Sequence, residues 1–237
     1  MVYKGSKNRI AKHIVPILQK SVYEMGTGLY IEPFVGGANI IDKIKAPTRI
    51  GCDFNKYLIS LLDYISNNDL QIDTFTEDKY KYVKNNKSEF KDWELGLYGF
   101  CGSYGSKFFD TFARGNKNNG EPRDMPRERI NNLKKQSGNL KDVTFKHCNF
   151  KELKDLVGYT IYCDIPYKGT SKYDDDFDYE YFYEWCKKMS INNNVFVSEY
   201  HMPFGKVVWS GELRSSINNA SQRDVVIERL FYIEKER

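Results

Sequence analysis

Apolar residues near the start of the chain recur at helical spacing, at Ile10, Ile14, Ile17, Leu18 and Val22. This spacing predicts an amphipathic helix over residues 10–22. A short apolar run at 29–31 predicts a strand, and a second strand is expected at 49–52; a glycine turn and a helix expected at 38–44 separate the two. A second amphipathic helix is expected at 58–65. Strand, glycine turn, helix and strand in this order are typical of a βαβ unit, and therefore of a parallel sheet.

The strand pattern stops between residue 66 and about residue 142. Polar helical segments there surround a stretch rich in glycine and aromatic residues at 97–105, and an extended loop is expected around 115–126. Because no long helix separates the last strands of the chain, we expect an antiparallel hairpin at one edge of the sheet. The strands expected after the interruption are 143–147, 160–163, 195–198, 206–209 and 225–233, with one helix at 178–189.

This order of elements predicts an α/β fold with one sheet and a mostly helical insertion. The main domain is expected to comprise residues 1–65 and 143–237, and the insertion residues 66–142. A chain of 237 residues is long enough for one well-filled core. Its 41% hydrophobic and 29% charged residues are ordinary for a globular protein and argue against wholesale disorder.

Positive charge is concentrated in the insertion. The whole chain has a formal net charge of +4, and between Lys107 and Lys141 nine Lys or Arg residues face four Asp or Glu residues. The rest of the chain is therefore close to neutral. A basic segment of this kind suits contact with a polyanion such as a nucleic acid. A solvated, loop-rich surface is the alternative, and composition alone favours neither.

Cysteine, histidine and hydropathy patterns exclude several other classes of protein. The five cysteines and three histidines are scattered and form no CxxC pair, so we expect reduced thiols and no protein-bound metal. No apolar run approaches the ~20 residues needed to cross a bilayer. The first residues lack the apolar stretch of a signal peptide, which indicates a cytoplasmic protein.

Two glycines, Gly36 and Gly37, follow the first predicted strand. Glycines in this place let the backbone approach a ligand closely. Asp53 ends the next strand, where a carboxylate can accept hydrogen bonds from the ribose hydroxyls of a nucleoside. The pair is a weak signal by itself, because a simple turn and a helix-capping aspartate would give the same pattern.

A second candidate group, Asp164-Ile165-Pro166-Tyr167, follows the apolar strand at 160–163. An acid at the carboxyl end of a central parallel strand lies where open α/β sheets bind ligands. Pro166 biases Ile165 towards an extended conformation and so fixes the direction of the Ile165 carbonyl. Two fixed acceptors followed by an aromatic ring suit an extruded base with an exocyclic amine. The alternative is a strand end with a capping aspartate and a core tyrosine.

Together these elements resemble the Dam-like (D12 class, α-group) DNA adenine methyltransferases, which implies a bacterial or phage origin. That family carries an F-x-G-x-G-type cofactor loop, a target-recognition insertion and a DPPY-type catalytic loop in this order, and the resemblance covers nearly the whole chain. It implies a Rossmann-like S-adenosylmethionine-dependent methyltransferase sheet. By position, the cofactor S-adenosylmethionine would contact Tyr3, Gly5, Ser6, Lys7, Pro33, Phe34, Gly36, Gly37, Ala38, Asp53, Phe54, Asn149, Phe150 and Asp164.

Three positions depart from the family pattern. The second glycine of the cofactor loop comes one place early, at Gly37, and Asn149 stands where the family usually has an acid. The amide oxygen of Asn149 can still accept a hydrogen bond from an adenine amine. Ile165 replaces the first proline of DPPY, a position that contributes its carbonyl and not its side chain. The expected chemistry therefore stays in place.

The resemblance implies methyl transfer to N6 of adenine in double-stranded DNA after base flipping, with Asp164, Ile165, Pro166 and Tyr167 as catalytic residues. No proline is followed by cysteine, which argues against methylation of cytosine C5. Methylation of cytosine N4, of RNA or of a small molecule remains an alternative, as does a catalytically weak DNA-binding module of the same fold. Neither a membrane nor an obligatory protein partner is implied. The DNA contacts are expected at Lys107, Arg114, Lys117, Arg123, Arg127 and Arg129.

Overall fold

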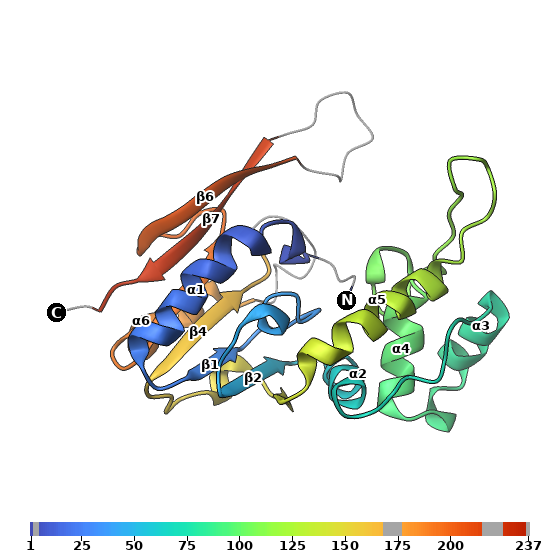
Figure 1. Cartoon of the computed structure of the whole chain (residues 1–237), viewed down its shortest axis with the longest axis horizontal. Coiled ribbons are helices and arrows are strands. Elements are labelled where there is room, and N and C mark those ends of the chain that lie inside the picture. Colours follow the sequence, from blue (N-terminus) through green and yellow to red (C-terminus); the bar gives the residue numbers. More distant parts are fainter. Residues whose placement is uncertain (2–4, 168–176, 215–224, 236–237) are drawn as a thin grey trace.

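The structure is a computed structural model that describes residue 1 and residues 5–167, 177–214 and 225–235. The described residues form a seven-stranded sheet with strand order β3-β2-β1-β4-β5-β7-β6 (Figure 1). The strands are β1 (Leu29–Glu32), β2 (Thr48–Asp53), β3 (Val143–His147), β4 (Tyr159–Asp164), β5 (Asn194–Glu199), β6 (Lys206–Arg214) and β7 (Val225–Ile233).

The sheet is mixed, with a parallel part and an antiparallel edge. The strands from β3 to β5 are parallel, whereas β7 runs antiparallel to β5 and β6 antiparallel to β7. The predicted α/β fold and the antiparallel pair at the edge are therefore confirmed. The chain continues from β1 to β2 on one side, while β4 lies on the other side, so the strand order reverses between β1 and β4. Open α/β sheets bind ligands at such a reversal, outside the carboxyl ends of the strands.

Helices cover both faces of the sheet. Side chains alternate between the faces along a strand, and in β4 Tyr162 lies in one core while Ile161 lies in the other. The first face is covered by α1 (Ala11–Met25) and α2 (Lys56–Asn67), and the second by α6 (Tyr179–Ser190). Burial on both sides explains why the central strands are continuous apolar runs. None of the described helices is both long and apolar enough to span a membrane.

The segment between α2 and β3 forms helices that pack against the rest of the fold. Figure 1 shows these helices grouped to one side of the sheet, next to α2. They share one continuous core with α1 and α2. Gly96 lies so close to the Tyr57 carbonyl of α2 that a Cβ atom there would have no room. The division into two domains stays a prediction. The three helices are α3 (Glu77–Asn85), α4 (Asp92–Cys101) and α5 (Met125–Leu140).

The helix predicted at 38–44 is wrong, because only a short 3-10 helix, Ile41–Lys43, forms there. Ala38 has a positive φ of 54°, a left-handed conformation that a right-handed α-helix does not contain. Ile40 and Ile44 are buried in a compact loop instead. β1 is therefore followed by a loop and not by a helix N-terminus. The other predicted helices and strands are present, with their ends moved by a few residues.

Candidate active site

Three acidic side chains lie where β1, β2 and β4 end. Glu32, Asp53 and Asp164 are the last residues of these strands. Because the strands are parallel neighbours, their carboxyl ends meet at one edge of the sheet. Glu32 and Asp53 are 2% and 6% exposed, and the side chain of Asp164 is 24% exposed. Burying a carboxylate is costly unless it is partnered, so the partners of these acids define the candidate site.

Asp53 is held by the glycine loop that follows β1. Its Oδ2 accepts the Gly36 N–H at 3.1 Å and its Oδ1 accepts the Asn55 N–H at 3.0 Å. Gly36 has a φ of 47°, a left-handed conformation that favours glycine. Burial raises the pKa of Asp53, and the two N–H groups oppose that rise. The cap of α2 is Asn55, whose side-chain oxygen accepts the N–H groups of Tyr57 and Leu58, so Asp53 is not the capping residue.

A cluster of three aromatic rings includes Phe34 of the glycine loop. Phe34 packs against Phe150, with ring centroids 5.2 Å apart, and both rings pack against Phe177. Asn149 is exposed, and its side chain caps the 3-10 helix that begins at Phe150. Phe54 is 66% exposed. The loop residues Pro33, Gly37 and Ala38 are buried.

Lys7, in the N-terminal segment, is 7% exposed and pairs with the carboxylates of Asp164 and Glu228. Its Nζ lies 2.9 Å from Asp164 Oδ1, 3.3 Å from Glu228 Oε1 and 4.2 Å from the centroid of the Tyr167 ring. Burial alone would lower the pKa of Lys7, but the two carboxylates raise it overall. Burial raises the pKa of Asp164 to about 6; Lys7 opposes this rise, while Glu228 and Glu199 add to it. The site therefore holds one ammonium group between two carboxylates.

The neighbours of Lys7 in the chain have local structural roles. The Ser6 hydroxyl accepts the Asn8 N–H at 3.4 Å and so caps the 3-10 helix Lys7–Arg9. Gly5 is exposed and has a φ of 78°. Tyr3, which the resemblance places at the cofactor, lies outside the described residues. Of the expected N-terminal contacts, the structure brings Lys7 next to Asp164.

The segment after Asp164 is anchored at three points. The Ile165 side chain is 3% exposed in the core on the α6 side of the sheet. Tyr179 of α6 donates its hydroxyl to the Pro166 carbonyl at 2.9 Å. Tyr167 is 9% exposed and donates its hydroxyl to Glu228 Oε1 at 2.6 Å. The ring expected to meet a base is therefore fixed by its own hydroxyl.

Five of the six basic residues expected to contact DNA are exposed, and each lies near an acid. Exposed ion pairs contribute only about 0–1 kcal/mol, so a polyanion can compete with these acids for the basic groups. The pairs are Lys107 with Asp110, Arg114 with Glu77, Lys117 with Glu121, Arg123 with Glu128 and Arg127 with Asp124.

Arg129 differs from these five residues because it is 6% exposed. Its guanidinium donates to the carbonyl oxygens of Cys101, at 3.0 Å, of Ser103 and, at 3.5 Å, of Phe100. The carbonyls of Phe100 and Cys101 lie in the last turn of α4, where backbone acceptors have no partner within the helix, and Ser103 follows in the adjoining turn. We therefore correct the assignment of Arg129 to the DNA contacts, because its guanidinium caps a buried helix end.

Sequence reasoning missed three polar residues of the site. Glu32 could have been found, because it ends a predicted strand directly before the glycine loop. Glu228 interrupts an apolar strand, a weak signal that does not say which groups it meets. Gln136 of α5 donates to the carbonyl oxygens of Gly37 and Ala38, at 3.1 and 2.9 Å. Only tertiary structure brings Gln136 to the glycine loop.

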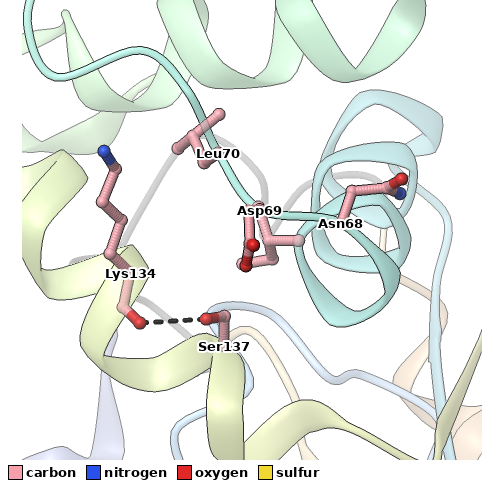
Figure 2. Close-up of a pocket in the computed structure, with 6 residues that line it drawn as sticks. Asn68, Asp69, Leu70, Lys134 and Ser137 are labelled. Carbon is pink, nitrogen blue, oxygen red and sulfur yellow. Dashed lines mark hydrogen bonds between the residues drawn. The ribbon is translucent and has the colours of Figure 1, made fainter.

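A hollow of about 260 Å³ lies between the C-terminal end of α2 and α5. Figure 2 shows its lining residues Lys134 and Ser137 on α5, and Asn68, Asp69 and Leu70 on the segment that follows α2. None of its lining residues belongs to β1, β2 or β4. Lys134 pairs with Asp73 at 2.6 Å. The hollow is therefore separate from the group of acids at the strand ends.

Comparison with known proteins gives one family. The sequence model of the D12 class N6 adenine-specific DNA methyltransferase family matches residues 3–189. Among solved structures, the chain is similar to SMU.472, which was crystallised in complex with SAH. That similarity has 12% sequence identity and a TM-score of 0.36, and it covers 100% of this chain and 56% of the other, so the chain spans just over half of that protein's length. A search of curated proteins found no match.

Proposed function

Because the chain belongs to the D12 class N6 adenine-specific DNA methyltransferase family, we propose that it transfers a methyl group from S-adenosylmethionine to N6 of an adenine in duplex DNA. The observation that carries this proposal is the position of Asp164. This carboxylate ends β4 at the reversal of strand order, next to the strand that leads into the glycine loop, and pairs with Lys7. Open α/β sheets bind their ligands at this position.

The residues around Asp53 fit a nucleoside cofactor. Backbone N–H groups fix both carboxylate oxygens, and each oxygen can accept a further hydrogen bond from a ribose hydroxyl. Phe34 and Phe150 offer flat apolar surface to an adenine ring. When bound, S-adenosylmethionine supplies an electrophilic methyl group on its sulfonium. We assign the further contacts to Tyr3, Gly5, Ser6, Lys7, Pro33, Gly36, Gly37, Ala38, Phe54, Asn149 and Asp164.

Asp164 acts on the amine of the target adenine. That amine is a poor nucleophile, because its lone pair is delocalised into the ring. An ionised Asp164 accepts one N–H and the Ile165 carbonyl accepts the other, which favours a pyramidal nitrogen and stabilises the positive charge that develops on it. Lys7 favours the ionised form of Asp164. Since N6 is paired inside a duplex, the adenine must first leave the base stack.

The test is a transfer assay on duplex DNA with methyl-labelled S-adenosylmethionine, followed by nucleoside analysis. We expect N6-methyladenine in one short motif. Asp164→Asn should abolish transfer, whereas Asp155→Asn, at an exposed aspartate between the 3-10 helix Phe150–Glu152 and β4, should leave it unchanged. N4-methylcytosine as the only product would contradict the assignment to adenine. DNA binding without transfer by the wild-type protein would contradict the activity itself.

A further inference from the structure

Glu228 is a buried acid in a strand that is otherwise largely apolar. It lies in β7 and is 2% exposed. Leu230, two residues further on and therefore on the same face of the strand, belongs to the core that α1 covers. The family match ends at residue 189, so it assigns no role to Glu228.

The partners of Glu228 are the residues that surround Asp164. Its Oε1 accepts the Tyr167 hydroxyl at 2.6 Å and lies 3.3 Å from Lys7 Nζ. The same ammonium nitrogen lies 2.9 Å from Asp164 Oδ1. Lys7 thus bridges two carboxylates from different strands, and one oxygen of Glu228 contacts both Lys7 and Tyr167.

Stability alone does not account for this arrangement. Removing two charges from water costs several kcal/mol per ion, and an apolar replacement of a buried pair is often neutral or stabilising. A leucine at position 228 would continue the apolar pattern of β7. What a leucine could not do is hold the ammonium of Lys7 and the hydroxyl of Tyr167 at fixed positions.

We propose that Glu228 is a positioning residue of the methyl-transfer site, a role that rests on the proposed function. Glu228 holds the ammonium group of Lys7 in place. Because Asp164 Oδ1 pairs with the same ammonium group, this contact also orients the Asp164 carboxylate. By accepting the Tyr167 hydroxyl, Glu228 sets the plane of the ring that the extruded base would meet. In this role Glu228 acts through Lys7 and Tyr167, and not by contact with the adenine or the cofactor.

The charge of Glu228 also affects Asp164, whose carboxylate would accept a hydrogen bond from the target amine. The negative charges of Glu228 and Glu199 raise the pKa of Asp164, and Lys7 lowers it. Without the charge of Glu228, the pKa of Asp164 should fall and Lys7 should pair with Asp164 alone. A more tightly paired Asp164 is a weaker acceptor for the amine. Among the described residues, the titratable groups that interact with Asp164 are Lys7, Glu32, Tyr162, Cys163, Tyr167, Glu199, Tyr200 and Glu228.

The first test compares Glu228→Gln with Glu212→Gln, an exposed glutamate on the neighbouring strand β6. For Glu228→Gln we expect kcat to fall about tenfold or more while KM for DNA and cofactor changes little, since the lost interaction serves the reacting geometry. The acid limb of its pH–rate profile should move to lower pH. Glu212→Gln should match the wild type in both. If Glu228→Gln also matches the wild type, the proposal is overturned.

A second measurement does not require methyl transfer. Carboxyl carbons of labelled aspartate are titrated by NMR in the free protein, with Asp164→Asn identifying the signal of Asp164. The midpoint for Asp164 should lie at lower pH in Glu228→Gln and stay in place in Glu212→Gln; equal midpoints would overturn the proposal even if the wild type transferred no methyl group. If Glu228→Gln does not fold, Tyr167→Phe removes the hydroxyl that Glu228 holds and should lower kcat in the same way. Unchanged kcat there would overturn the proposal too.

Discussion

Replacing Arg129 by methionine removes a guanidinium that caps the end of α4 and keeps a long apolar side chain in its place. In the structure Arg129 is 6% exposed and donates to the carbonyls of Cys101 and Ser103, with a longer contact to Phe100. The substitution leaves these buried carbonyls without the donor. It also relieves the cost of burying a cation, which offsets part of the loss.

The size of the effect follows from the number of contacts. A hydrogen bond to a charged group contributes about 1.5–3 kcal/mol, and two of the three contacts are close. After the relief of desolvation, we expect Arg129→Met to lower the free energy of unfolding by about 2–4 kcal/mol. For a chain of this length that is a fall in Tm of roughly 5–15 °C.

The assay is thermal denaturation, with Arg127→Met as the control variant. Arg127 lies two residues from Arg129 on the same helix, α5. The Arg127 side chain is 52% exposed and pairs with Asp124 at the surface, so its replacement should change stability by less than about 0.5 kcal/mol. DNA affinity should show the opposite order, with the larger loss for Arg127→Met. Wild-type stability together with weakened DNA binding in Arg129→Met would refute the reasoning and restore Arg129 to the DNA contacts.

The other predictions concern pH, cofactor and DNA. Because the pKa of Asp164 is raised to about 6 and the protonated carboxyl loses its charge, methyl transfer should fall as pH drops below that value; a pH–rate profile that stays flat there would contradict the role of Asp164. Asp53→Ala should weaken binding of S-adenosylmethionine by roughly 1–3 kcal/mol, and unchanged affinity by calorimetry would remove Asp53 from the cofactor contacts. Reversing the charges of Arg114, Arg123 and Arg127 should flatten the log–log salt dependence of DNA affinity by about one unit per lost phosphate contact, whereas an unaltered slope would mean that this surface is only solvated.

Local pattern was enough to predict most of the fold. The central strands are buried on both faces, so they read as apolar runs whose position in the chain is unmistakable. β6 is longer than the strand expected at 206–209, because an edge strand is held by backbone pairing and continues through Ser210 and Glu212. The helix expected at 38–44 failed for a different reason. It was expected from the order of the elements, and that order does not reveal that Ala38 takes a left-handed conformation.

Only those residues of the candidate site that end a predicted strand could be found from the local pattern of the sequence. Asp53 and Asp164 were found because each ends an apolar strand, and parallel strands share one carboxyl edge. The pairing of Lys7 with Glu228 joins residues at opposite ends of the chain, and no local pattern contains that information. Arg129 was assigned to DNA because charge counts do not distinguish a buried guanidinium from an exposed one.

The close packing of α4 on α2 has a consequence for engineering. Gly96 leaves no room for a side chain against Tyr57, and the core runs without a break from α1 through α5. A chimera that exchanges residues 66–142 for the corresponding segment of a relative must therefore keep a glycine at position 96 and match the surface that α2 presents. Grafts cut at the ends of the segment will separate two halves of one core, so sequence preference is better altered through exposed side chains such as Arg123 and Arg127 than by exchange of the whole segment.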